Sequence, residues 1–134
     1  DYSTKSVAKM LNEHKKDILC VRGNCDTEVD QMVLAFPILA GYCVIAEGER
    51  LIYATHGHIF NEKNLPPLHQ GDVLLHGHTH VPVCKEHGNY TCLNPGSVSI
   101  PKEESWHGYL ILENGVFVWK DLDGEEKIVW KLRE

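Results

Sequence analysis

Histidine is the residue type whose number and spacing most clearly indicate chemistry in this sequence. The chain has 134 residues and nine histidines. Six of these lie between positions 56 and 80, and five of the six form two groups, at positions 56–58 and 76–80. Neutral imidazole rings, together with amide and carboxylate oxygens, are ligands that suit divalent ions such as Mn²⁺, Zn²⁺, Fe²⁺ and Ni²⁺. A metal site is therefore the first hypothesis. The clustered histidines are His56, His58, His76, His78 and His80.

Three short apolar runs each lead into a polar segment that contains a glycine. If the three runs are neighbouring strands of one sheet, their carboxyl ends meet at one edge, which is where open α/β sheets place their sites. The spacing therefore predicts that the polar residues gather at one edge. The runs and their polar segments are Ile18–Val21 with Arg22–Asp26, Leu51–Ala54 with Thr55–His58, and Val73–Leu75 with His76–His80.

Other classes of site and partner lack their signals. The sequence has no GxSxG, no Walker A loop, no GxGxxG and no cysteine pair at zinc-finger spacing. The net charge of −6, without a run of Lys or Arg, argues against binding to duplex nucleic acid. No apolar stretch is long enough for a membrane span, and five scattered cysteines predict reduced thiols in a cytoplasmic protein.

The hydrophobic periodicity predicts one mixed α/β domain over residues 1–134, with helices early and strands late. A helix is expected from Ser3 to Lys16, and a second one beginning at Asp26 or Thr27 and ending before Pro37. Turn signals at Asn114-Gly115 and Asp123-Gly124 divide the last part into three strands. The other expected strands are Ile18–Val21, Tyr42–Ala46, Leu51–Ala54, Val73–His76, Val81–Lys85 and Tyr90–Leu93.

Four motifs, in this order and spacing, resemble the calcineurin-like metallophosphoesterase superfamily, and within it the bacterial YfcE-type phosphodiesterases. The resemblance implies an αββα sandwich of two mixed sheets flanked by helices. It also implies a phosphodiesterase that attacks phosphorus with a hydroxide bridging two divalent ions. Mn²⁺ is the expected metal, with Zn²⁺, Fe²⁺ or Ni²⁺ as alternatives. The motifs are Gly23–Asp26, Thr55–His58, Gly77–His80 and Asn94–Ser97.

The resemblance assigns metal ligands residue by residue. Asn24, His56 and His78 would hold one ion, and His80 would belong to the other. Read without the resemblance, Asn24 could be a turn residue with left-handed geometry. His76 lies within its predicted strand, where a structural role is the better interpretation.

The remaining motif residues would act on the substrate. Cys25 stands where many members of the superfamily have a histidine that protonates the leaving group, and a thiol could supply that proton. Asp26 is assigned to the catalytic loop, as a helix N-cap that also anchors it. His58, Asn94 and Ser97 are expected beside the substrate, although His58 could be a plain loop histidine and 94–97 a simple turn.

Two acidic motifs of the family, DxH and a GD that closes a strand, do not occur before Gly23. Gly71-Asp72 precedes a strand instead of closing one. We therefore expect a chain without the N-terminal strand-helix-strand, which binds one ion weakly and turns over a small phosphodiester poorly. The alternative is a non-catalytic scaffold or protein-interaction module of the same fold, like the retromer subunit. Self-association through exposed strand edges is a further hypothesis.

Overall fold

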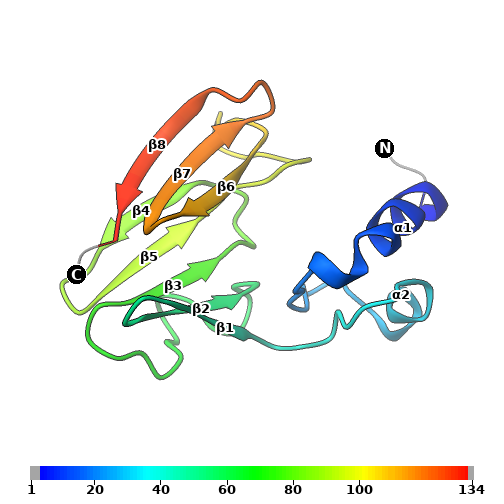
Figure 1. Ribbon diagram of the computed structural model, residues 1–134, viewed down its shortest axis with the longest axis horizontal. Helices are drawn as coiled ribbons and strands as arrows, with labels where there is room; N and C mark the ends of the chain where they lie inside the picture. The colour runs from blue at the N-terminus through cyan, green and yellow to red at the C-terminus, as the bar shows by residue number, and fades with distance from the viewer. Residues whose placement is uncertain (1–3, 133–134) are drawn as a thin grey trace.

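Two β-sheets stacked on each other, with two helices to one side, make up the computed structural model, which describes residues 4–132 (Figure 1). The predicted mixed α/β class is confirmed. The first sheet has five strands in the order β1-β2-β3-β5-β4. Their bounds are β1 Cys43–Glu47, β2 Arg50–Thr55, β3 Asp72–His76, β4 Val83–Glu86 and β5 Tyr90–Asn94.

The centre of the first sheet is parallel. Strand β3 pairs in parallel with β2 on one side and with β5 on the other, while β1 and β4 run antiparallel along the edges. Thr55 lies opposite His76, and Leu75 opposite Leu93. The three parallel strands therefore end together, and in Figure 1 the arrowheads of β3 and β5 point toward the side where the helices lie.

The second sheet is an antiparallel meander of β6 (Gly108–Glu113), β7 (Val116–Asp121) and β8 (Glu126–Lys131). Asn114 and Gly115, the predicted hairpin residues, both have positive φ, as a two-residue turn of type I′ requires. Two mixed sheets were predicted, but the second sheet has no parallel pair because short turns join consecutive strands. Between the sheets lies a core of Ile52, Val73, Leu93, Phe117 and Trp119.

Both predicted helices form, with shifted ends. Helix α1 spans Thr4–Glu13 and is followed by one turn of 3₁₀-helix, Lys15–Asp17. The predicted first residue, Ser3, lies outside the described residues. Helix α2 spans Glu28–Val33, and its N-cap is Thr27 rather than Asp26. Thr27 Oγ1 accepts a hydrogen bond from the Asp30 backbone N–H, and the Asp30 carboxylate accepts one from the Thr27 backbone N–H, which is a capping box.

The strand predicted at Ile18–Val21 is wrong. The segment is extended without ladder pairing, and the backbone bond that ends it runs from Arg22 N–H to the Ala40 carbonyl at 2.8 Å. An apolar run becomes a strand only when a neighbouring strand satisfies its backbone groups, and none lies beside this run among residues 4–132. Within the same described part of the chain, no helix is long and apolar enough to cross a membrane.

Candidate metal centre

The parallel pairing of β2 and β3 brings His56 and His78 into contact. His56 follows the last residue of β2, and His78 comes two residues after the end of β3. Nδ1 of His78 lies 3.2 Å from Nε2 of His56, and the two ring centroids are 5.0 Å apart. The sequence prediction that these histidines meet at the carboxyl edge of the sheet is confirmed.

The two histidine loops are bonded to each other through their backbones. Gly77 N–H donates to the His56 carbonyl at 2.8 Å. Gly57 has φ +116°, and a Cβ on it would lie 2.8 Å from Nδ1 of His76, so only glycine fits. His78 and His80 also have positive φ, 72° and 63°. Left-handed backbone is costly for such residues and is typical of functional sites.

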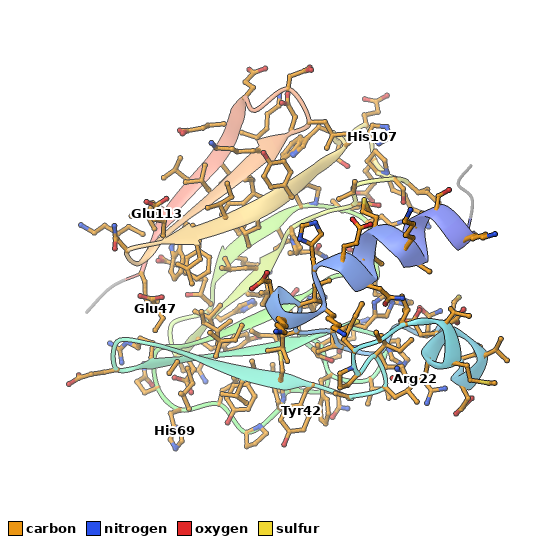
Figure 2. All side chains as sticks on the ribbon, turned by 45° about the vertical axis from the view of Figure 1, so that its right-hand side comes forward. Arg22, Tyr42, Glu47, His69, His107 and Glu113 are labelled. Atoms are coloured by element: carbon orange, nitrogen blue, oxygen red, sulfur yellow. The ribbon has the colours of Figure 1, made fainter. Side chains whose placement is uncertain are left out.

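Asn24 reaches the same cluster from the segment before α2. Its Oδ1 lies 2.7 Å from Nε2 of His56. Asp26 fixes the loop, because its Oδ2 accepts a hydrogen bond of 2.7 Å from Gly23 N–H. Arg22, labelled in Figure 2, donates from Nε to the Asp26 carbonyl at 3.1 Å. The expected anchoring role of Asp26 is therefore confirmed, although it does not cap the helix.

His58 and Cys25 border the cluster on its solvent side. The His58 ring is exposed, and its centroid lies 5.3 Å from that of His56 and 6.2 Å from that of His78. Cys25 is also exposed, with its Sγ 3.6 Å from Nδ2 of Asn24. Both side chains can therefore meet a ligand bound at His56 and His78.

The electrostatics of the cluster favour neutral imidazole. Burial lowers the pKa of His56, and the neighbouring His78, His58 and His80 lower it further, while Asp26 acts in the opposite direction. A neutral ring leaves a nitrogen lone pair available, which is the form of histidine that binds metals.

The donor atoms at the cluster fit divalent ions. Ligand atoms bound to one ion at about 2.0–2.2 Å are about 3 Å apart in octahedral and about 3.5 Å apart in tetrahedral geometry. The contacts that join Asn24, His56 and His78 are 2.7 and 3.2 Å. Nδ1 of His80 is buried and has no hydrogen-bond partner. Among the bonds of the described residues, none joins His80 directly to His56 or His78.

Asn94 supports the loop Gly77–His80 through side-chain hydrogen bonds. Its side chain is 0% exposed. Its Nδ2 donates to the Gly77 carbonyl at 3.2 Å and to Thr79 Oγ1 at 3.0 Å, and its Oδ1 accepts from Gly96 N–H at 2.9 Å. Any contribution of Asn94 to substrate binding therefore acts through the position of the loop Gly77–His80.

Ser97 lies on the segment that follows Asn94. Its Oγ accepts a hydrogen bond of 2.9 Å from Ile100 N–H, and its carbonyl accepts one of 3.0 Å from Gly108 N–H. The side chain is half-buried and shapes this loop. Gly96 packs the same loop against Pro82, because a Cβ on Gly96 would come within 3.0 Å of the proline ring.

The sequence profile of the calcineurin-like phosphoesterase superfamily domain matches residues 1–115. The chain belongs to this superfamily. Phosphodiesterase YfcE of Escherichia coli is 48% identical to it over 115 residues, which are 86% of this chain and 62% of the relative. The chain thus spans less than two thirds of the length of this curated relative.

Two solved structures agree with the fold. A structure of the phosphoesterase YfcE from E. coli superposes with a TM-score of 0.94 at 41% identity, covering 98% of this chain and 73% of that one. Vacuolar Protein Sorting 29 from Cryptosporidium parvum superposes with a TM-score of 0.58 at 22% identity, covering 96% of this chain and 77% of that one. The latter likeness concerns the fold alone.

Two residues that the superfamily motifs did not single out also shape the centre. Thr79 receives the Asn94 amide and in turn accepts a hydrogen bond of 3.4 Å from Val81 N–H. Its position between two predicted ligands was the available signal. His76, predicted to be structural, is buried beneath Gly57 with Nδ1 bonded to the Gly77 carbonyl at 2.9 Å. Its place within an apolar strand was the signal for this interior position.

Proposed function

We propose that the protein is a metal-dependent phosphodiesterase that hydrolyses a small phosphodiester with two divalent ions, Mn²⁺ first among them. The observation that carries the proposal is the convergence of Asn24 Oδ1, His56 Nε2 and His78 Nδ1 at the carboxyl edge of the sheet. Membership of the superfamily and the 48% identity to a curated phosphodiesterase support it.

In this proposal Asn24, His56 and His78 hold one ion and His80 belongs to the other. When bound, the ions would activate a water molecule for in-line attack and offset the charge that develops on the phosphoryl oxygens. The chain would hold its histidine ligands in fixed positions before the substrate arrives, because the parallel strand ends and the hydrogen bonds of Asn94 fix the loops that carry them. Such preorganisation avoids the cost of ordering the site during the reaction.

The exposed residues beside the ligands would contact the substrate. His58 is placed to donate from its ring to a phosphoryl oxygen, and Cys25 Sγ to give its proton to the oxygen of the departing alcohol. Asp26 positions the loop that carries Cys25. Ser97 and Asn94 set the adjoining loops.

The substrate is proposed to be small, since the net charge of −6 offers no surface for a long polyanion. A cytoplasmic location with reduced cysteines remains a prediction. All five thiols are free in the fold. Self-association also remains a prediction.

Hydrolysis of bis(p-nitrophenyl) phosphate with added Mn²⁺ tests the proposal. His78→Ala should abolish the activity. His69 is an exposed histidine that precedes the start of β3 (Figure 2), and His69→Ala should leave the activity unchanged. Activity that survives in His78→Ala would contradict the assignment. Mn²⁺ binding at the histidines without any turnover would favour the non-catalytic scaffold instead.

A further inference from the structure

A second group of potential metal ligands lies on the first sheet, on the face that points away from the core between the sheets. Cys92 pairs with Leu74 across β3 and β5, and His76 lies two residues after Leu74. Because side chains alternate along a strand, Cys92 and His76 face the same side. Val73 and Leu93 face the opposite side and pack against the second sheet.

The segment between β2 and β3 brings Glu62 over these two residues. The ligand atoms of Glu62, His76 and Cys92 all lie within 4.8 Å of one another. His76 and Cys92 are buried, and Glu62 is on the surface. Thiolate, imidazole and carboxylate together form a donor set that Zn²⁺ uses in proteins.

The hydrogen bonding of His76 points independently to a ligand. Its Nδ1 lies 2.9 Å from the Gly77 carbonyl, which can only accept, so the proton of the neutral ring is on Nδ1. The lone pair therefore lies on Nε2, which is buried and has no hydrogen-bond partner. A histidine whose other N–H is bound to a backbone carbonyl while its free nitrogen faces other donors is the usual arrangement of a metal-binding histidine.

The turn that carries Glu62 is fixed in place. Asn61 and Asn64 exchange two backbone hydrogen bonds, of 3.0 and 3.1 Å. Nδ2 of Asn61 also donates to the Gly57 carbonyl at 3.1 Å. The turn is thus tied directly to the loop that holds His56 and His58. The remaining two ligands lie on central strands, so the backbone that carries all three ligands is held in place without an ion.

We propose that Glu62, His76 and Cys92 form a second metal site that takes Zn²⁺, with His87 or water in the fourth position. His87 borders the site, because its Nε2 lies 2.5 Å from a carboxylate oxygen of Glu62, and it would have to leave that oxygen to bind the ion. A tetrahedral Zn²⁺ holds its ligand atoms about 3.5 Å apart, and the three ligand atoms here already lie within 4.8 Å of one another. The bound ion would fasten the segment between β2 and β3 to the sheet, and with it the loop of His56.

Zinc binding at this site requires the Cys92 thiol to lose its proton to solvent as the Zn–S bond forms. Burial raises the pKa of Cys92 to about 12, and the Glu62 carboxylate adds to the increase. Cys92 is therefore a thiol until a cation stands next to it, and zinc binding should weaken as the pH falls.

Co²⁺ titration of the full chain tests the site independently of the proposed phosphodiesterase activity. The parent for this experiment carries His56→Ala, His78→Ala and Cys25→Ser, so that neither the first centre nor the exposed thiol beside it contributes. We expect one Co²⁺ per chain with a thiolate-to-cobalt charge-transfer band, which one equivalent of Zn²⁺ removes.

Matched variants of this parent identify the ligands. Cys92→Ser should abolish the band, and Glu62→Gln, which keeps the size of a surface side chain, should weaken Co²⁺ binding at least about tenfold. Cys43→Ser on β1 should have no effect. The proposal is overturned if the parent shows no thiolate band, if the band persists in Cys92→Ser, or if Glu62→Gln binds as tightly as the parent.

Discussion

Nδ1 of His78 and Nε2 of His56 lie 3.2 Å apart although 22 residues separate them in the chain. The contact results from one feature of the fold, the parallel pairing of β2 with β3, which ends both strands at the same level. Asn24 joins the pair through His56 alone. His56 is therefore the central ligand of the candidate centre.

The central position of His56 predicts a graded loss of metal affinity. His56→Ala removes the atom that contacts both Asn24 and His78, so Mn²⁺ affinity should fall by more than about tenfold. His58→Ala removes an exposed ring at the margin, and the fall should be smaller. Isothermal titration calorimetry with Mn²⁺ measures both. Equal losses in the two variants would show that His56 has no special place in the site.

Two substitutions of Asp26 can separate its anchoring role from a role of its negative charge. Asp26→Ala removes the acceptor for Gly23 N–H and frees the loop of Asn24, so Mn²⁺ affinity should fall about tenfold, the size typical for loss of a supporting contact. Asp26→Asn keeps an acceptor oxygen and should bind nearly as well as the native chain. If Asp26→Asn lowers Mn²⁺ affinity as much as Asp26→Ala does, the site requires the negative charge of Asp26 itself.

Gly57 should tolerate no side chain. Its φ of +116° already disfavours alanine, and a Cβ would press on Nδ1 of His76. Gly57→Ala should lower the free energy of unfolding by about 1–3 kcal/mol through overpacking, beyond the backbone strain, and should displace His56 from His78. Urea unfolding and Mn²⁺ titration measure these effects.

Gly88→Ala is the matched control for this change. Gly88 also has a positive φ, +86°, but a Cβ there meets nothing within 4 Å. It should show the strain of the left-handed backbone, about 1–2 kcal/mol, and unchanged Mn²⁺ binding. Indistinguishable behaviour of the two variants would mean that the collision with His76 is relieved at no cost.

Much of this architecture could be predicted from residue patterns, because local chemistry determines it. Asn114 and Gly115 favour the left-handed turn that they form, and the apolar run before His56 becomes a strand. The run Ile18–Val21 has the same appearance but forms no strand, since pairing depends on neighbours that a local pattern does not contain.

The candidate site was predictable in a similar way. Its histidine ligands follow strand ends next to glycines, so their convergence could be expected from the sequence. The burial of Asn94 could not, because an asparagine in a turn motif looks the same whether it faces solvent or the loop above it. The proximity of Glu62 to Cys92 also lay beyond a local pattern, since the irregular segment between β2 and β3 creates it.

Asn94 should matter for stability as well as for the site. Asn94→Ala removes a fully buried side chain and leaves Gly96 N–H without its acceptor, so the free energy of unfolding should fall by about 1–3 kcal/mol. The bond from Trp119 Nε1 to the Asn94 carbonyl is retained. Asn89→Ala, at an exposed turn, should change stability by less than about 0.5 kcal/mol. Chemical denaturation compares the two, and equal stabilities would contradict the supporting role of Asn94.

The thiols should differ sharply in reactivity toward iodoacetamide. Burial raises the pKa of Cys92 to about 12, so at pH 8 only about one molecule in ten thousand carries the reactive thiolate, and the reagent cannot reach the buried sulfur. Cys25 is exposed and should be labelled first in chelator-treated native protein. Mass spectrometry of tryptic peptides follows both sites, and Cys25→Ser should lose the fast phase. Cys92 should react only after unfolding in urea; labelling of Cys92 at the rate of Cys25 in native protein would show that the face of the sheet beneath Glu62 is open to solvent.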